Sequence, residues 1–128
     1  MSRVFARVLL GAALTACAPV RGGDAIDVVS LQRQLDTTRA DAGICSALAL
    51  SREDVARYFA LAEVVDAATF DAEAIIMPCS YRGTLRRAGK LYQWEVFAGG
   101  AAYLYDGAVT NQRYLCRESC LAALPNLR

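Results

Sequence analysis

The chain of 128 residues contains no histidine and only one lysine, Lys90. Without histidine it lacks the commonest general base of enzymes, and with it the Ser-His and Cys-His nucleophile pairs. Lys90 falls in a predicted hairpin turn, a solvated place where burial does not lower the pKa of an amine. The glycine-rich phosphate loop of a strand-to-helix junction is also missing. The sequence therefore offers no catalytic residue, and we predict that the protein is not an enzyme.

Long apolar runs are missing too. The most apolar stretch near the amino terminus, residues 8–14, has seven residues, whereas a helix needs about 20 to cross a bilayer. It follows a segment that contains Arg3 and Arg7 and no acid, and it ends in small residues. A basic segment, a short apolar run and small residues at its exit predict a secretory signal peptide.

The residues that close this segment, Leu14-Thr15-Ala16-Cys17, resemble the lipobox of bacterial lipoproteins. In that family an aliphatic residue and two small residues precede a cysteine whose sulfur receives a diacylglycerol before cleavage on its amino side. The resemblance implies a signal peptide over 1–16 and a mature chain that begins at Cys17, carrying diacylglycerol and an N-acyl chain. Several acyl chains hold a protein at a membrane permanently, because each buried methylene contributes about 0.8 kcal/mol. A plain secretory signal, with Cys17 as an ordinary thiol, is the alternative.

The residue after the cysteine bears on which membrane is meant. In lipoproteins of Gram-negative bacteria an aspartate at this place favours retention at the inner membrane. Because Ala18 stands here, the resemblance implies the outer membrane, with the protein facing the periplasm. Pro19 and Gly22-Gly23 then predict a flexible tether over 17–24. Residues 25–128 are enough for a single periplasmic domain.

Charge is balanced overall and uneven along the chain. Removing Arg3 and Arg7 from the 14 basic residues leaves 12 against 13 acids, which does not favour nucleic acid as a partner. Residues 17–75 hold five basic and ten acidic groups, and residues 76–128 hold seven and three. Halves of opposite sign can attract each other in one fold or present two faces to different partners, and we favour the first.

The clearest helix signal begins at Ser51, which is followed three residues later by Asp54, the partner expected in a capping box. Apolar residues then recur at three- and four-residue steps up to Val65, which predicts an amphipathic helix over 52–66. Its aromatic pair, Tyr58 and Phe59, fits a core better than a ligand platform. Asp66 to Glu73 is expected to be a connection with a single helical turn, and the spacing of apolar residues in 25–42 predicts a short helix with a mobile end.

Beyond Glu73 the apolar pattern alternates, which predicts strands. The first runs from Ile75 to Arg86 with Pro78 outside the ladder, and the others cover 92–98, 101–105 and 113–117. Turns at 87–90, Gly99-Gly100 and Asp106-Gly107 connect them as consecutive hairpins. The predicted fold class is α+β, with one amphipathic helix packed on a three- to four-stranded antiparallel meander and stapled by disulfides.

With Cys17 assigned to the lipid, an even set of cysteines remains, namely Cys45, Cys79, Cys116 and Cys120. In an oxidising compartment this favours two disulfides. We favour Cys79–Cys116 with Cys45–Cys120, because a Cys116–Cys120 bond closes too small a loop to restrict the unfolded chain much. A zinc site is the rival interpretation, but there is neither histidine nor a C-x-x-C knuckle. Nor does C-x-x-x-C have the spacing of a redox-active pair. We predict no metal and no cofactor apart from the lipid.

The polar face of the predicted meander is the best candidate for a binding surface. Tyrosine and arginine are enriched at interface hot spots, and this face carries Arg82, Thr84, Arg86, Gln93, Glu95, Tyr103 and Tyr105. The alternative is that Tyr103 and Tyr105 cover core while their hydroxyls stay wet. Glu95 is expected to pair across strands with Arg82 or Arg86, and nothing brings it to Asp106 as a glycosidase pair would require.

A second resemblance concerns stretches within residues 79–116. The stretches Cys79–Leu85 and Tyr92–Val96, with Gly99-Gly100 and Tyr114–Cys116, are similar to small envelope domains of bacteria, a likeness that implies no activity and no catalytic residue. We therefore expect a lipid-anchored outer-membrane lipoprotein that binds an envelope protein, as a complex subunit, an inhibitor or an immunity protein. The alternative is a small ligand-binding or carboxylate-dependent hydrolytic domain.

Overall fold

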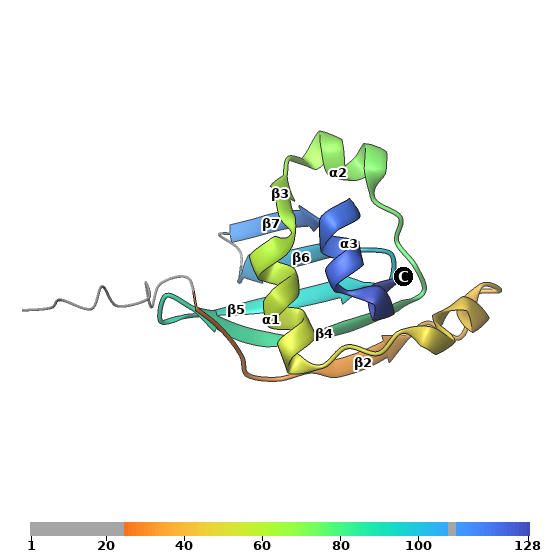
Figure 1. The fold of residues 1–128 in the computed structure, drawn as a ribbon, viewed down its shortest axis with the longest axis horizontal. Helices are drawn as coiled ribbons and strands as arrows, with labels where there is room; N and C mark the ends of the chain where they lie inside the picture. The colour runs from red at the N-terminus through yellow and green to blue at the C-terminus, as the bar shows by residue number, and fades with distance from the viewer. Residues whose placement is uncertain (1–24, 108–109) are drawn as a thin grey trace, which may run out of the picture.

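The computed structural model describes residues 25–107 and 110–128. The predicted signal peptide, Cys17 and the tether therefore lie outside the described residues. One antiparallel sheet of seven strands dominates the fold, in the order β1-β4-β5-β6-β7-β3, with β2 also paired to β4 (Figure 1). Its strands are β1 (Ile26–Val28), β2 (Gln32–Leu35), β3 (Glu63–Val65), β4 (Cys79–Arg87), β5 (Lys90–Phe97), β6 (Ala101–Asp106) and β7 (Thr110–Leu115).

The helices are short. They are α1 (Arg52–Leu61), α2 (Ala67–Glu73) and α3 (Glu118–Ala123), with 3₁₀ helices η1 (Ala42–Ala47) and η2 (Pro125–Leu127). Within residues 25–107 and 110–128 none of them is long and apolar enough to cross a membrane.

The predicted fold class, one helix on a three- to four-stranded meander, is wrong. β4 to β7 do pair consecutively, but they are the middle of a larger sheet that β1 and β2 extend on one side and β3 on the other. The helix predicted within 25–42 is instead β1 and β2. Each of these three short strands pairs with a strand at least 44 residues further along the chain, the separation of Leu35 from Cys79. Their conformation therefore depends on distant partners rather than on local pattern.

Helix α1 begins as predicted. The Ser51 hydroxyl accepts from the amide of Asp54, and the Asp54 carboxylate accepts from the amide of Ser51, which confirms the capping box. The helix stops at Leu61 rather than at 66, because Val64 and Val65 pair with β7, and β-branched residues suit a strand better than a helix. Asp66 then caps α2 by accepting from the amide of Thr69 at 2.7 Å.

Most of the core lies between one face of the sheet and helices α1 and α3, which cross it side by side in Figure 1. Phe59 of α1 packs edge-on against Tyr114 at 5.1 Å and Trp94 at 6.4 Å between ring centres. These rings are buried, as the helical stripe predicts, so Tyr58 and Phe59 belong to the core. Trp94, fully buried, has the one side-chain polar atom within the described residues that is buried without a hydrogen-bond partner, its indole Nε1.

The opposite face of the sheet is largely open. Helix α2 covers one end of it, where Phe70 forms a small second apolar cluster with Ala101 and Leu115. The remainder carries polar side chains, because strand residues alternate between faces. This open face supports the site described below.

The turns follow the sequence. Between β4 and β5, Ala88 and Gly89 both have positive φ, at 52° and 74°, the conformation of a tight I′ hairpin turn.

The two halves of the chain are interleaved: β1, β2 and β3 from the acidic half pair with β4 and β7 from the basic half. Arg117 adds ion pairs to Glu63, at 3.5 Å, and to Glu73.

Candidate functional site

The polar side chains of the open face form two rows across the strands. The strand register aligns Gln32, Arg82, Glu95, Tyr103 and Arg113 in the first row. The second row contains Thr84, Gln93, Tyr105 and Asn111. Arg86 lies further along β4, opposite Asp27. The five residues predicted as a binding surface, Arg82, Arg86, Glu95, Tyr103 and Tyr105, thus share one face of the sheet.

Not all of these side chains are equally free. The ring of Tyr103 packs against Phe70 of α2 at 5.1 Å and against Phe97 at 6.0 Å, so it covers the second apolar cluster. Tyr105, in contrast, lines a depression of about 260 Å³ together with Arg82 and Gln93. The tyrosines therefore divide between the two interpretations of the sequence: Tyr103 covers core, and Tyr105 faces an open surface hollow.

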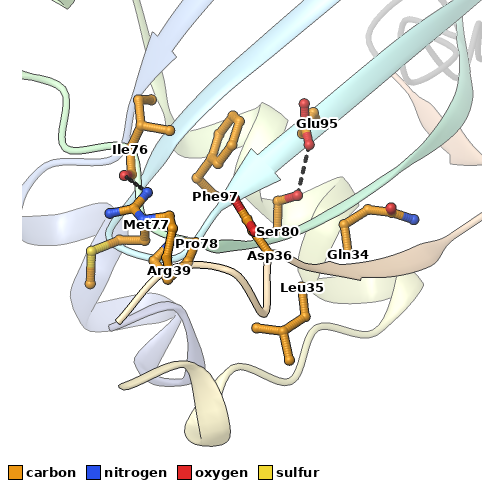
Figure 2. A pocket seen from close by; sticks show the side chains of 10 residues that line it. All are labelled: Gln34, Leu35, Asp36, Arg39, Ile76, Met77, Pro78, Ser80, Glu95 and Phe97. Carbon is orange, nitrogen blue, oxygen red and sulfur yellow. Dashed lines mark hydrogen bonds between the residues drawn. The ribbon is translucent and has the colours of Figure 1, made fainter. Parts of the chain in front are cut away.

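Next to this hollow is a larger pocket of about 320 Å³, at the end of the sheet where β2 and β5 finish and β4 begins (Figure 2). It contains both acidic and apolar groups, together with one arginine. Its lining residues are Gln34, Leu35, Asp36, Arg39, Ile76, Met77, Pro78, Ser80, Glu95 and Phe97. A cavity of this size is within the range of ligand pockets in proteins.

Glu95 is fixed at one side of the pocket. The buried Ser80 hydroxyl of β4 donates to Oε2 of Glu95 at 2.7 Å, the dashed line in Figure 2. These two residues are diagonal neighbours on the open face, since Ser80 pairs with Phe97, two residues beyond Glu95. Arg82 stands directly opposite Glu95, yet within the described residues no ion pair joins them. The expected cross-strand ion pair is thus replaced by a bond to Ser80.

The second carboxylate is that of Asp36, just after β2. Its Oδ1 accepts from the hydroxyl and from the amide of Thr38. Both hydrogen bonds favour the ionised form, the hydroxyl's contribution being the larger, and they lower the pKa of Asp36 below its usual value. The pocket therefore holds an ionised carboxylate at neutral pH.

Arg39 is the one cation among the lining residues. Its Nε and Nη2 donate to the two oxygens of Asp41 at 3.0 and 2.7 Å, and its Nη1 donates to the carbonyl oxygen of Ile76 at 2.9 Å. The guanidinium thereby links the segment after β2 to the extended segment before β4, as Figure 2 shows for Ile76. Its charge is paired with Asp41, and it also contributes, less than the bonds from Thr38, to the lowered pKa of Asp36.

The four cysteines form two disulfides, and the pairing that we favoured is wrong. The bonds are Cys45–Cys79 and Cys116–Cys120, with Cα atoms 5.8 and 5.2 Å apart, which suits disulfide geometry. Leu35 pairs with Cys79, and the chain then turns back through η1, which brings Cys45 to the start of β4. Cys116 directly follows β7, and Cys120 lies in α3. All four residues are buried.

The remaining sequence candidates lie elsewhere. Asp106 forms an ion pair with Lys90, which raises the pKa of the lysine above its usual value. Asp106 and Glu95 are not brought together, because Glu95 pairs with Tyr103, three residues before Asp106. In the described part of the chain, no group of three or more potential metal-ligating side chains is assembled.

Of the residues that line the pocket, only Glu95 was a candidate site residue in the sequence. A helix was predicted for the segment that contains Gln34, Asp36 and Arg39. Their position beside β4 was therefore not predicted. Arg113 and Asn111 were accessible in principle, because they alternate with the buried Tyr114 along β7. A larger hollow of about 530 Å³ also escaped notice. It is mainly apolar, near α3 and the β5–β6 turn, and it is lined among others by Ile75, Leu115 and Leu121.

Comparisons of this chain with protein-family models, with curated proteins and with solved structures found no match.

Proposed function

We propose that this chain is a lipoprotein anchored in the outer membrane through Cys17 and facing the periplasm, and that it works there as a non-enzymatic protein-binding module. Support for the anchor comes from Leu14-Thr15-Ala16-Cys17 after a short apolar run and two arginines. Support for binding comes mainly from one observation, the polar rows on the open face of the sheet. An envelope complex subunit and an inhibitor or immunity protein are the two roles that fit such a surface.

The open face has the composition of a protein interface. Arg82 and Tyr105 line one hollow, Arg113 extends the row of Arg82, and arginine and tyrosine are the side chains that most often carry binding energy. α1 and α3 occupy the other face and α2 covers one end of this one, so the rest of it is open to a partner. The mixture of charges along it suits orientation and specificity more than bulk affinity.

The alternative, a small ligand-binding or carboxylate-dependent hydrolytic domain, is favoured by the two carboxylates of the pocket. Asp36 fits a binding role better than acid catalysis. A general acid needs a raised pKa to hold its proton at neutral pH, whereas the hydrogen bonds from Thr38 lower the pKa of Asp36.

The anchor is tested by fractionating cells that express the full chain with Cys17→Ser. Loss of the acyl chains releases the protein from the membrane fraction. Ala18→Asp serves as a second variant, which stays membrane-bound but moves from the outer to the inner membrane on a density gradient. A Cys17→Ser chain that stays with the outer membrane contradicts the anchor.

The binding role is tested with a carboxy-terminally tagged full chain, cross-linked in the envelope and purified. A stoichiometric protein partner is expected, and Arg82→Glu on the open face abolishes its capture. Arg57→Glu is the matched control, because Arg57 is exposed on α1, on the other side of the sheet. Tyr103→Ala is a weaker choice, since that ring also packs on Phe70. Equal capture by all variants, or a bound small molecule without a protein, argues against this role.

A further inference from the structure

The pocket of Figure 2 combines apolar and acidic surface. Beside the carboxylates of Glu95 and Asp36, its apolar lining includes Ile76, Pro78 and Phe97. The side chains of Leu35 and Met77, at its edge, point away from Glu95 in Figure 2. A side chain with an aliphatic stem and a charged head meets both needs, because the stem covers apolar surface while the head keeps polar partners. This describes lysine and arginine.

Both carboxylates have an oxygen to spare. Ser80 occupies Oε2 of Glu95, and Thr38 occupies Oδ1 of Asp36. Within residues 25–107 and 110–128, the other oxygen of each carboxylate accepts no hydrogen bond and forms no ion pair. Each carboxylate is thus held in position by one oxygen and can accept from a ligand with the other.

The positive charges nearby are already committed or point elsewhere. All three nitrogens of the Arg39 guanidinium donate to Asp41 or to Ile76. Arg82 lines the neighbouring hollow with Gln93 and Tyr105 and is not among the residues that line the pocket. The lining has two carboxylates and one arginine, and that arginine is also paired with Asp41, so negative charge is in excess there.

We propose that this pocket receives a basic side chain, in particular arginine, presented by the partner protein. The proposal rests on the proposed binding function, and it gives the partner a chemistry. A guanidinium is planar and offers several donors in a fixed fork, so it suits two separate carboxylate oxygens better than the compact ammonium of lysine does. Arg82, beside the pocket, then suits an acidic or hydroxyl group next to that arginine on the partner.

The position of the pocket agrees with such a role. Ile26, near the start of the described chain, pairs with Arg87 at one end of β4, whereas Leu35 beside the pocket pairs with Cys79 at the other end. At about 3.3 Å per residue, the nine residues of β4 separate these points by roughly 26 Å. An anchor ahead of β1 leaves the pocket at the far end of the domain.

The pocket is tested with two probes on the purified full chain, blocked arginine (N-acetyl-arginine methylamide) and blocked citrulline, its uncharged isostere. In a nuclear magnetic resonance titration, blocked arginine is expected to move the backbone amide signals of Ser80, Glu95 and Phe97. The dissociation constant of blocked citrulline is expected to be at least ~tenfold higher, because it cannot form a charge-assisted hydrogen bond. Equal binding of both probes, or arginine shifts spread over the surface, overturns the proposal.

Variants of the two carboxylates test whether the blocked arginine binds in this pocket. Glu95→Gln keeps an acceptor for Ser80 and removes the charge, and Asp36→Asn does the same for Thr38, so both are expected to fold and to weaken arginine binding ~tenfold. Glu53→Gln, an exposed carboxylate in the first turn of α1, is the matched control and leaves binding unchanged. Folding is checked by the unchanged amide shifts of the α1 core residues. Unaltered arginine binding in Glu95→Gln and Asp36→Asn also overturns the proposal.

Capture from the envelope then separates this inference from the proposed function. Loss of the partner with Arg82→Glu and with Glu95→Gln supports both. If Arg82→Glu abolishes capture of the partner and Glu95→Gln does not, the open face is supported as the binding surface. The proposal that the pocket receives an arginine of the partner is then overturned. If the chain binds blocked arginine specifically but captures no protein, the pocket does bind a guanidinium. Its assignment to a protein partner is then overturned, together with the proposed function.

Discussion

The hydroxyl of Tyr58, on α1, donates a 2.7 Å hydrogen bond to the carbonyl oxygen of Gly100, 42 residues further along the chain in the β5–β6 connection. Tyr58 is buried, and its ring packs edge-on against Phe59 at 5.1 Å. This bond therefore joins the main helix to a turn at the far end of the sheet, close to the Cys116–Cys120 disulfide.

Replacing Tyr58 with phenylalanine tests this link. The ring is kept, and the Gly100 carbonyl loses one of two donors, because the amide of Cys116 also donates to it at 2.9 Å. The expected cost is that of one hydrogen bond, about 0.5–1.5 kcal/mol of unfolding free energy. Tyr105→Phe, on the open face, removes a hydroxyl that is more exposed and is expected to cost under about 0.5 kcal/mol. Urea denaturation of both variants measures the difference, and equal losses would contradict the role of Tyr58.

The same residue predicts a loss of stability at high pH. Burial raises the pKa of Tyr58 well above its usual 10.0, and Tyr114 raises it further, because a phenolate there loses its hydration. A group whose pKa is higher in the folded state stabilises that state fully below the unfolded pKa. Its contribution therefore declines as pH rises above about 10, with a slope of up to ~1.4 kcal/mol per pH unit. The measurement is the unfolding free energy of wild type and Tyr58→Phe from pH 8 to 11. The advantage of the wild type should shrink above pH 10, and a constant gap would rule out the assignment.

Gly83 in β4 is held close to the connection between β1 and β2. A Cβ atom at this position would lie 2.0 Å from the Ser30 carbonyl oxygen and 2.6 Å from its carbon. Both are backbone atoms, so Gly83→Ala must displace the chain and is expected to cost about 1–3 kcal/mol, as overpacking does. Gly43→Ala is the control, because a Cβ there meets no atom within 4 Å. Thermal or urea unfolding that ranks the two variants equally would show that the connection moves freely.

The two disulfides should differ in what they contribute. Cys45–Cys79 spans 34 residues and Cys116–Cys120 spans four. In the chain-entropy model, loops of these sizes correspond to about 4 and about 2 kcal/mol. Double replacement by alanine at 45 and 79 should therefore lower the unfolding free energy by about 2 kcal/mol more than replacement at 116 and 120. The order is checked by urea denaturation of each double variant, and a reversed order would mean that the bonds act through the folded state.

Loop entropy explains why our pairing of the cysteines failed. It governs how much a bond stabilises once it is formed, but it does not decide which sulfurs meet. That is set by β2 pairing with β4, which places Cys45 beside Cys79, and by the chain reversal from β7 into α3, which places Cys116 beside Cys120. The number of bonds could be predicted from the sequence, and the partners could not.

The sequence was most informative where structure is local. The capping box at Ser51, the stripe that buries Tyr58 and Phe59, and the turn before Lys90 depend on neighbours in sequence. The alternation along β4 to β6 likewise placed Arg82, Glu95 and Tyr105 on a common face.

It failed where partners are distant. β1 and β3 have three residues each and β2 has four, too few for an alternating pattern to be recognised. Because β2 was missed, Asp36 and Arg39 could not be placed beside Glu95. The pocket depends on the pairing of β2 with β4. It could therefore not be predicted from the sequence, although the sequence contains all of its side chains.

The pairing of the strands also sets an order for folding. None of β1, β2 and β3 pairs with another strand of the first half, since their partners are β4 and β7. The β4 to β7 meander, in contrast, forms from hairpins between neighbours, and local contacts form fastest. Leu127 of η2, fully buried, accepts a 2.7 Å hydrogen bond from the amide of Gly99, so η2 packs against the β5–β6 turn. We therefore expect β1 and β2 to remain unpaired until β4 has formed, and β3 until β7 has formed, so the two edges of the sheet are added after its middle.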